Sequence, residues 1–155
     1  MQLKAEKLRA GRYYILDMQG EPIPALNMET WGRFFERPER HILETRTKLF
    51  WVSTVFLGIN HNWDPDGPPI IFESMAFLQP KPRDIAAVLG ESPLIGDGEL
   101  GERYSTRDHA IAGHIAMVAE CLAMEAQHKH ADLERILRRK APSARRAKIQ
   151  MKKAA

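Results

Sequence analysis

The stretch LFWVSTVFLGINHNWDPDGPPIIFESMAFL spans residues 49–78 and decides the fold. Two runs rich in β-branched and aromatic residues, 49–58 and 69–78, flank a connection crowded with Asn, Asp, Pro and Gly. This arrangement predicts a β-hairpin whose strands are joined by a long, structured loop. Because apolar residues occupy both faces of each run, we expect inner strands that are covered on both sides.

Glu73 is the exception in the second run, since it shares a strand face with Ile71, Met75 and Phe77. A carboxylate on such a face is expensive to leave unpaired. We therefore predict that a histidine, His61 or His114, lies within hydrogen-bonding reach of Glu73. Such pairing would lower the pKa of Glu73 and raise that of the histidine.

The composition is that of one soluble domain. A chain of 155 residues buries about two-thirds of its unfolded surface on folding, and its 44% hydrophobic and 28% charged residues are ordinary values. Cys121 is the only cysteine, which excludes an intrachain disulfide and favours a reducing compartment. No stretch has the apolar length of a signal peptide or a membrane helix, so we expect a cytoplasmic protein without a membrane partner.

Charge is distributed unevenly along the chain. Of the 23 basic residues, eight lie from residue 138 onward, where no acidic residue occurs. The rest of the chain has 15 basic and 20 acidic residues, so the body carries a net charge of −5. We expect a mildly acidic body and a basic tail that attracts phosphate backbones without sequence preference. The nucleic-acid candidates are Arg138, Arg139, Lys140, Arg145, Arg146 and Lys148.

The region before the hairpin predicts a small β-unit and a short helix. Residues 13–16 read as a strand, Gly20 closes a turn at positive φ, and the prolines of 22–24 allow only an edge strand. Asn27 is placed to cap a helix that ends before Pro38.

The stripe on this short helix consists of Trp31, Phe34 and Phe35, which we interpret as core packing that covers one face of the sheet. Residues 40–48 could add a further strand of mixed polarity.

The region after the hairpin predicts a short helix over 82–89, a loop over 91–103 and a long helix over 106–140 that starts at Ser105. The long helix would span about 50 Å, more than the width of such a domain. It must therefore project, kink near His128–His130, or pack on another chain.

If the long helix packs on another chain, the protein is a homo-oligomer whose contact includes Leu133, Ile136 and Leu137.

Together these elements predict an α+β fold: an antiparallel sheet of four to six strands, a short aromatic helix and a long C-terminal helix. The expected organisation is a polar lead-in over 1–12, a single domain over 13–140 and a basic, disordered tail over 141–155.

The candidates for chemistry are His61, Glu73 and His114, with Asp64, Asp66 and Tyr104 as further members. If the long helix packs over the sheet, the first three could converge to ligate a metal or to perform acid–base chemistry. The alternative is a buried hydrogen-bond network that fastens the loop to the helix. No metal, nucleotide or nucleophile motif is present, which implies no cofactor, and Cys121 is interpreted as an inert core thiol.

The segments STVFLGINHNW, GPPIIFESMAF and ERYST…AGH resemble a signature of small uncharacterised proteins encoded by tailed bacteriophages and prophages. YYILDMQGEPIP and NMETWGRFFE also resemble the opening of that family, whereas residues 79–101 and the basic tail depart from it. The resemblance implies a phage or prophage setting in a bacterial cytoplasm and no particular activity.

Three functions follow as hypotheses. The first is a non-enzymatic phage or prophage accessory protein that binds a macromolecular partner such as a host protein. The second is a small metal-dependent or acid–base hydrolase that uses His61, Glu73 and His114. The third is a nucleic-acid-associated protein that acts through its basic tail.

Overall fold

A computed structural model gives an α+β fold and describes residues 11–64, 66–79 and 100–140. The strands are β1 (Tyr14–Leu16), β2 (Pro22–Pro24), β3 (His41–Arg46), β4 (Phe50–Phe56), β5 (Phe72–Leu78) and β6 (Leu100–Tyr104). The helices are α2 (Met28–Phe35), the 3₁₀ turn η1 (Pro38–Arg40), α4 (Arg107–Gln127) and α5 (His130–Lys140). The predicted fold class is confirmed.

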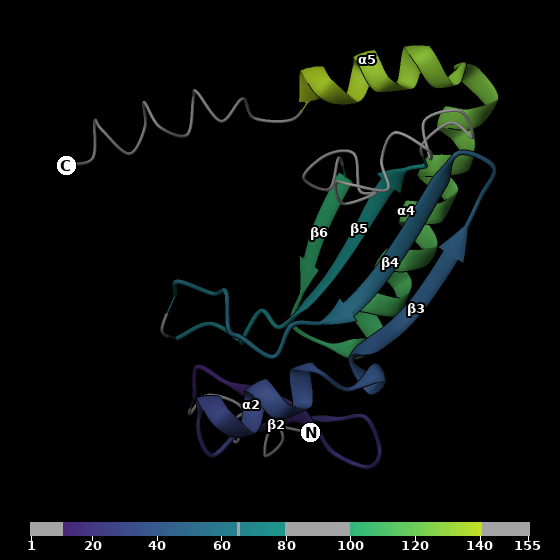
Figure 1. Ribbon diagram of the computed structural model, residues 1–155. Helices are drawn as coiled ribbons and strands as arrows, with labels where there is room; N and C mark the ends of the chain where they lie inside the picture. The colour runs from purple at the N-terminus through teal and green to yellow at the C-terminus, as the bar shows by residue number, and fades with distance from the viewer. Residues whose placement is uncertain (1–10, 65, 80–99, 141–155) are drawn as a thin grey trace.

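The hairpin of β4 and β5 forms the centre of an antiparallel sheet with the order β3-β4-β5-β6. Helix α4 lies along one face of this sheet (Figure 1). Both central strands alternate between a buried residue under α4 and a half-buried residue on the opposite face. The prediction that both faces are covered therefore holds for the α4 face, whereas the opposite face is only partly buried.

Two clusters of buried side chains make up the core. One joins the central strands to the two C-terminal helices and contains Phe50, Val52, Ala76, Leu78, Met117, Cys121, Leu133 and Leu137. The other joins the opposite end of the sheet to the N-terminal unit and contains Tyr14, Leu16, Phe34, Phe56, Ile71, Phe72 and Ala110. Burial raises the pKa of the Cys121 thiol to about 12, as expected for an inert core cysteine.

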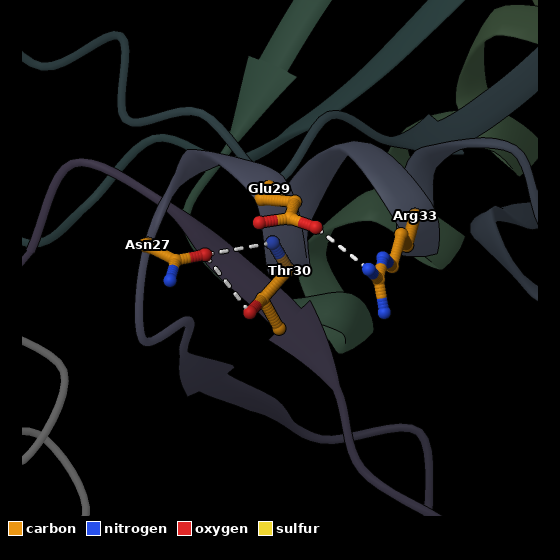
Figure 2. Close-up of polar contacts among 4 residues, drawn as sticks. All are labelled: Asn27, Glu29, Thr30 and Arg33. Carbon is orange, nitrogen blue, oxygen red and sulfur yellow. Dashed lines mark hydrogen bonds and ion pairs between the residues drawn. The ribbon is translucent and has the colours of Figure 1, made fainter.

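The N-terminal unit forms largely as predicted. Strands β1 and β2 pair antiparallel, and Gly20 in the connecting turn has a φ of 78°. Figure 2 shows the start of α2, where Asn27 Oδ1 accepts a hydrogen bond of 2.9 Å from the backbone N–H of Thr30. In the next turn Arg33 pairs with Glu29 at 2.6 Å.

Helix α2 lies at one end of the four-stranded sheet rather than across its face (Figure 1). Its Phe34 packs edge-on against Phe56, and Trp31 Nε1 donates to the carbonyl of Leu57 at 3.0 Å. Of the aromatic stripe, Phe34 is buried and Trp31 is partly buried, whereas Phe35 is exposed, so the predicted core packing holds for only part of it. The predicted cover of a sheet face is wrong, because the helix closes the end of the sheet.

The long C-terminal helix is broken. Helix α4 is capped by Thr106, one residue later than predicted, and it ends at His128, which has extended backbone geometry. The chain then turns and α5 crosses the end of the sheet (Figure 1). His130 Nε2 donates a hydrogen bond of 2.7 Å to the carbonyl of Gln79 and fixes this turn.

Leu133 and Leu137 cannot take part in the predicted intermolecular contact, because they are fully buried within the chain's own core, and Ile136 is partly buried. The kink near His128–His130, which the sequence left open, is the outcome that the structure shows.

Two further predictions can be placed. Residues 100–104 form the edge strand β6, although the sequence predicted a loop up to residue 103. The predicted lead-in over 1–12 falls mostly outside the described residues, and the helix over 82–89 and the tail over 141–155 lie wholly outside them.

Among the helices that the structure describes, none combines the length and apolarity needed to cross a membrane.

Candidate functional site

His114 lies under the sheet in a chain of hydroxyl groups. Its Nε2 is 2.8 Å from Thr45 Oγ1 on β3, and its Nδ1 is 2.8 Å from Thr54 Oγ1 on β4. Thr54 Oγ1 is in turn 2.6 Å from Ser74 Oγ on β5. This chain of side chains therefore connects α4 to β3, β4 and β5.

The environment of His114 is that of a structural residue. The side chain is 3% exposed, and burial lowers its pKa, which favours the neutral imidazole. A neutral ring has one donor and one acceptor nitrogen, and the hydroxyls of Thr45 and Thr54 can satisfy both. His114 does lie in a buried hydrogen-bond network, but this network fastens α4 to the strands and not to the loop, and hydroxyl groups take the place of the expected carboxylate.

Glu73 points to the opposite face of the sheet, because Ser74, its neighbour on β5, faces His114. Its partner is Arg103, the residue opposite it on β6, whose Nε donates to Glu73 Oε1 at 2.7 Å. The prediction that Glu73 has a partner is confirmed. The prediction that this partner is a histidine is wrong, because the cross-strand arginine takes the place.

His61 lies near this ion pair. Partial burial and the positive charge of Arg103 lower the pKa of His61, whereas Glu73 acts in the opposite direction. The raised histidine pKa predicted from the sequence is therefore wrong for both His61 and His114. In each case burial is the largest cause, and it disfavours the charged imidazolium.

A hollow of about 370 Å³ lies beside His61. It is lined by Gly11, Arg12, Ile59, Asn60, His61, Asn62 and Trp63. The N-terminal segment reaches this position because it pairs with the start of the loop: Tyr14 N donates to the carbonyl of Gly58, and Asn60 N donates to that of Arg12.

The loop after β4 is held by a series of turns in which Asn or Asp side chains accept backbone hydrogen bonds. Asn60 Oδ1 accepts from Asn62 N at 2.8 Å and from Ile70 N at 3.0 Å. Asn62 and Asp64 each accept from the residue two positions later, at 2.9 and 3.0 Å. Short Asn and Asp side chains favour such turns, so this polar sequence specifies a fixed loop.

Trp63 lies at the centre of this fixed loop and is 98% exposed. An indole ring buries a large apolar area whenever it finds a partner, and here it contacts mostly solvent. The sequence did not identify Trp63 as a site residue, because tryptophan side chains are largely buried in most folded proteins. We call Arg12, His61, Trp63, Glu73 and Arg103 together the Trp63 surface.

The proposed convergence of His61, Glu73 and His114 does not occur, because His114 lies on the other side of the sheet. Among the residues that the structure describes, no group of three or more His, Cys, Asp or Glu side chains could hold a metal ion. Of the nucleic-acid candidates, Arg138, Arg139 and Lys140 end helix α5, whereas Arg145, Arg146 and Lys148 lie outside the described residues.

The sequence missed Arg103 and the three hydroxyl residues around His114. Thr54 offered a signal, because it shares a strand face with Phe50, Val52 and Phe56, where a hydroxyl also requires a partner. Nothing in the sequence marked Arg103, because it comes at the end of a stretch rich in Gly and Pro that was predicted to be a loop.

Comparisons of this chain with protein-family models, with curated proteins and with solved structures gave no match.

Proposed function

We propose that this protein acts by binding another protein, and that the Trp63 surface makes the central contact. The observation that supports this proposal most strongly is the 98% exposure of Trp63 on a loop fixed by hydrogen bonds. Tryptophan is among the residues that contribute most energy to protein interfaces when it enters a pocket of the partner. A loop that is already ordered also loses little conformational entropy on binding.

The surroundings of Trp63 favour a protein over a nucleic acid. Asp64 and Asp66 follow it closely and are exposed, so they would repel a phosphate backbone. Arg12 and His61 line the same hollow as Trp63, and the Glu73–Arg103 pair lies near His61, so the surface has both donors and acceptors. An apolar centre with a polar rim is the usual anatomy of a protein interface.

The proposed role is non-enzymatic. The sequence-based enzyme hypothesis required His61, Glu73 and His114 in one site, and the sheet separates His114 from the other two. The setting remains the one that the sequence resemblance implies: a phage or prophage accessory protein whose partner is a protein of the bacterial host.

Site-specific photo-crosslinking tests this proposal. A photoreactive amino acid replaces Asp66, an exposed residue near Trp63 on the same loop, in one variant and Met18, which is 99% exposed, in a matched control. After irradiation in bacterial extract, we expect a discrete protein adduct from position 66 and none of the same mass from position 18. Equal adduct patterns from both positions, or no adduct from position 66, would contradict the proposal.

A second candidate function is nucleic-acid association through the basic tail. The positive charge of this tail is the observation that favours it. Replacing Arg145, Arg146 and Lys148 by Ala would then weaken DNA binding. It would also lower the slope of the salt dependence by about one for each phosphate that is no longer neutralised. Unchanged binding in a salt titration would exclude these three residues as phosphate contacts.

A further inference from the structure

The outer face of α4 is apolar from Ala112 to Ala126. The inner face packs on the sheet through Ala110, His114, Met117 and Cys121. On the opposite side, exposed alanines recur at alternating spacings of four and three residues: Ala112, Ala116, Ala119, Ala123 and Ala126. Beside them lie two larger side chains, Ile115 and Leu122, which are 64% and 51% exposed.

A helix packed on one side only normally carries charged residues on the other side. Here Glu120 is the only exposed charged residue between positions 110 and 126. The other acid in this range, Glu125, is partly buried and accepts hydrogen bonds from Leu49 N, at 2.7 Å, and from Thr47 Oγ1. An α-helix that is apolar on both sides is typical of one that is covered on both sides.

We propose that a second copy of this chain covers the outer face of α4, with the two α4 helices antiparallel and the two-fold axis near Ala119. This interface would be isologous, since the same residues of both copies contribute to it. It is separate from the Trp63 surface and does not depend on the function proposed above.

The sizes of the side chains fit this arrangement. An antiparallel pair centred on residue 119 brings Leu122 of one copy next to Ile115 of the other, because both lie on the same side of the alanine row. These larger apolar side chains cover one another along one side of the contact, and alanines face alanines along the other. Ala119 faces its own counterpart at the axis, where its small side chain allows the helices to approach closely.

The charges favour the same orientation. In an antiparallel pair, exposed Asp108 near the start of α4 lies close to exposed Lys129, just beyond the end of α4 in the second copy. A parallel pair would instead place Asp108 opposite Asp108 and Glu120 opposite Glu120, which is unfavourable. Near the axis, the two copies of Glu120 still lie on the rim and weaken the antiparallel association.

The expected affinity is moderate. Helix α4 has 21 residues and is about 31 Å long, so contact through this helix alone gives an interface at the lower end of specific ones. We expect a dimer that dissociates in the micromolar range.

Sedimentation measured over a range of concentrations tests the dimer. The wild-type mass should rise toward twice 17.7 kDa at high micromolar concentration. Ala119→Glu should raise the dissociation constant at least tenfold, whereas Ala131→Glu, the same change at an exposed alanine of α5, should leave it unchanged. A wild-type chain that stays monomeric throughout, or equal effects of the two variants, would overturn the proposal.

Disulfide trapping tests the orientation independently. Under mild oxidation, Ala119→Cys should form a covalent dimer, because the two introduced cysteines meet at the axis. Ala112→Cys should not, because the two copies of residue 112 lie about 20 Å apart in the antiparallel pair. Wild type controls for the buried Cys121. Rapid trapping through position 112, or none through position 119, would overturn the antiparallel arrangement.

Discussion

At the scale of single residues, His114 determines how stability should depend on pH. Its pKa is lowered by burial from an unfolded value of about 6.5, so the folded state binds fewer protons than the unfolded state below that pH. The stability is therefore fully present above about pH 6.5 and declines as the pH falls from there toward the lowered pKa of the folded protein.

We expect His114→Gln to remove part of this decline, because glutamine can still bond the hydroxyls of Thr45 and Thr54 but does not titrate. Chemical denaturation at about pH 7.5 and pH 5 would show it as a smaller loss of unfolding free energy than in wild type. His61 shifts in the same direction, so the slope should shrink rather than vanish. An identical slope in the variant would mean that His114 is not the buried neutral group described here.

At the scale of elements, helix α4 contains Gly113 at an interior position, where glycine is usually unfavourable. Glycine in a helix interior usually destabilises by roughly 1 kcal/mol relative to alanine. At Gly113, however, a Cβ atom would lie 2.0 Å from the hydroxyl of Tyr104. Tyr104 would have to leave its position beside Ser74, so we expect Gly113→Ala to destabilise the protein by about 1–3 kcal/mol.

Gly32 provides the matched control. It also lies within a helix, α2, but a Cβ atom there would meet nothing within 4 Å. Gly32→Ala should therefore follow helix propensity and stabilise by up to about 1 kcal/mol. Thermal melts of both variants decide the matter: a gain in melting temperature for Gly113→Ala would show that Tyr104 does not pack against α4.

The elements that the sequence predicted well are those fixed by local chemistry. Asn27 caps α2 and Gly20 takes a positive φ, because the geometry depends on the residue itself. The turn between α4 and α5 depends instead on distant partners, such as the bond from His130 to the carbonyl of Gln79. Leu133 joins the core only after that turn, so its burial could not be predicted from helical spacing.

At the scale of the whole molecule, two aromatic residues of the hairpin join the N-terminal unit to the sheet. Phe56 and Phe72 are buried, and their ring centroids are 5.1 Å apart. Replacing either by Ala should lower the unfolding free energy by about 3–5 kcal/mol. A thermal melt of each variant tests this expectation, and an unchanged melting temperature would contradict the packing of the sheet.

The candidate site shows the limit of sequence reasoning at this scale. Strand alternation shows that Glu73 and Ser74 face opposite sides, but it does not show which side α4 covers. The sequence predicts His114 near Glu73 because both are polar residues among apolar ones. In the structure each residue has its own hydrogen-bond partners. Glu73 pairs with Arg103 on one face of the sheet, and His114 bonds Thr45 and Thr54 on the other.

The most direct test of the central claim is the affinity of the protein partner, once trapped and purified, for three forms of the chain. We predict that Trp63→Ala weakens binding by about 2 kcal/mol or more, roughly 30-fold, as expected for a tryptophan anchor. Met18→Ala should bind like wild type, because Met18 is equally exposed but lies outside the Trp63 surface. Equal affinity of Trp63→Ala and wild type, measured by calorimetry on folded protein, would contradict the account.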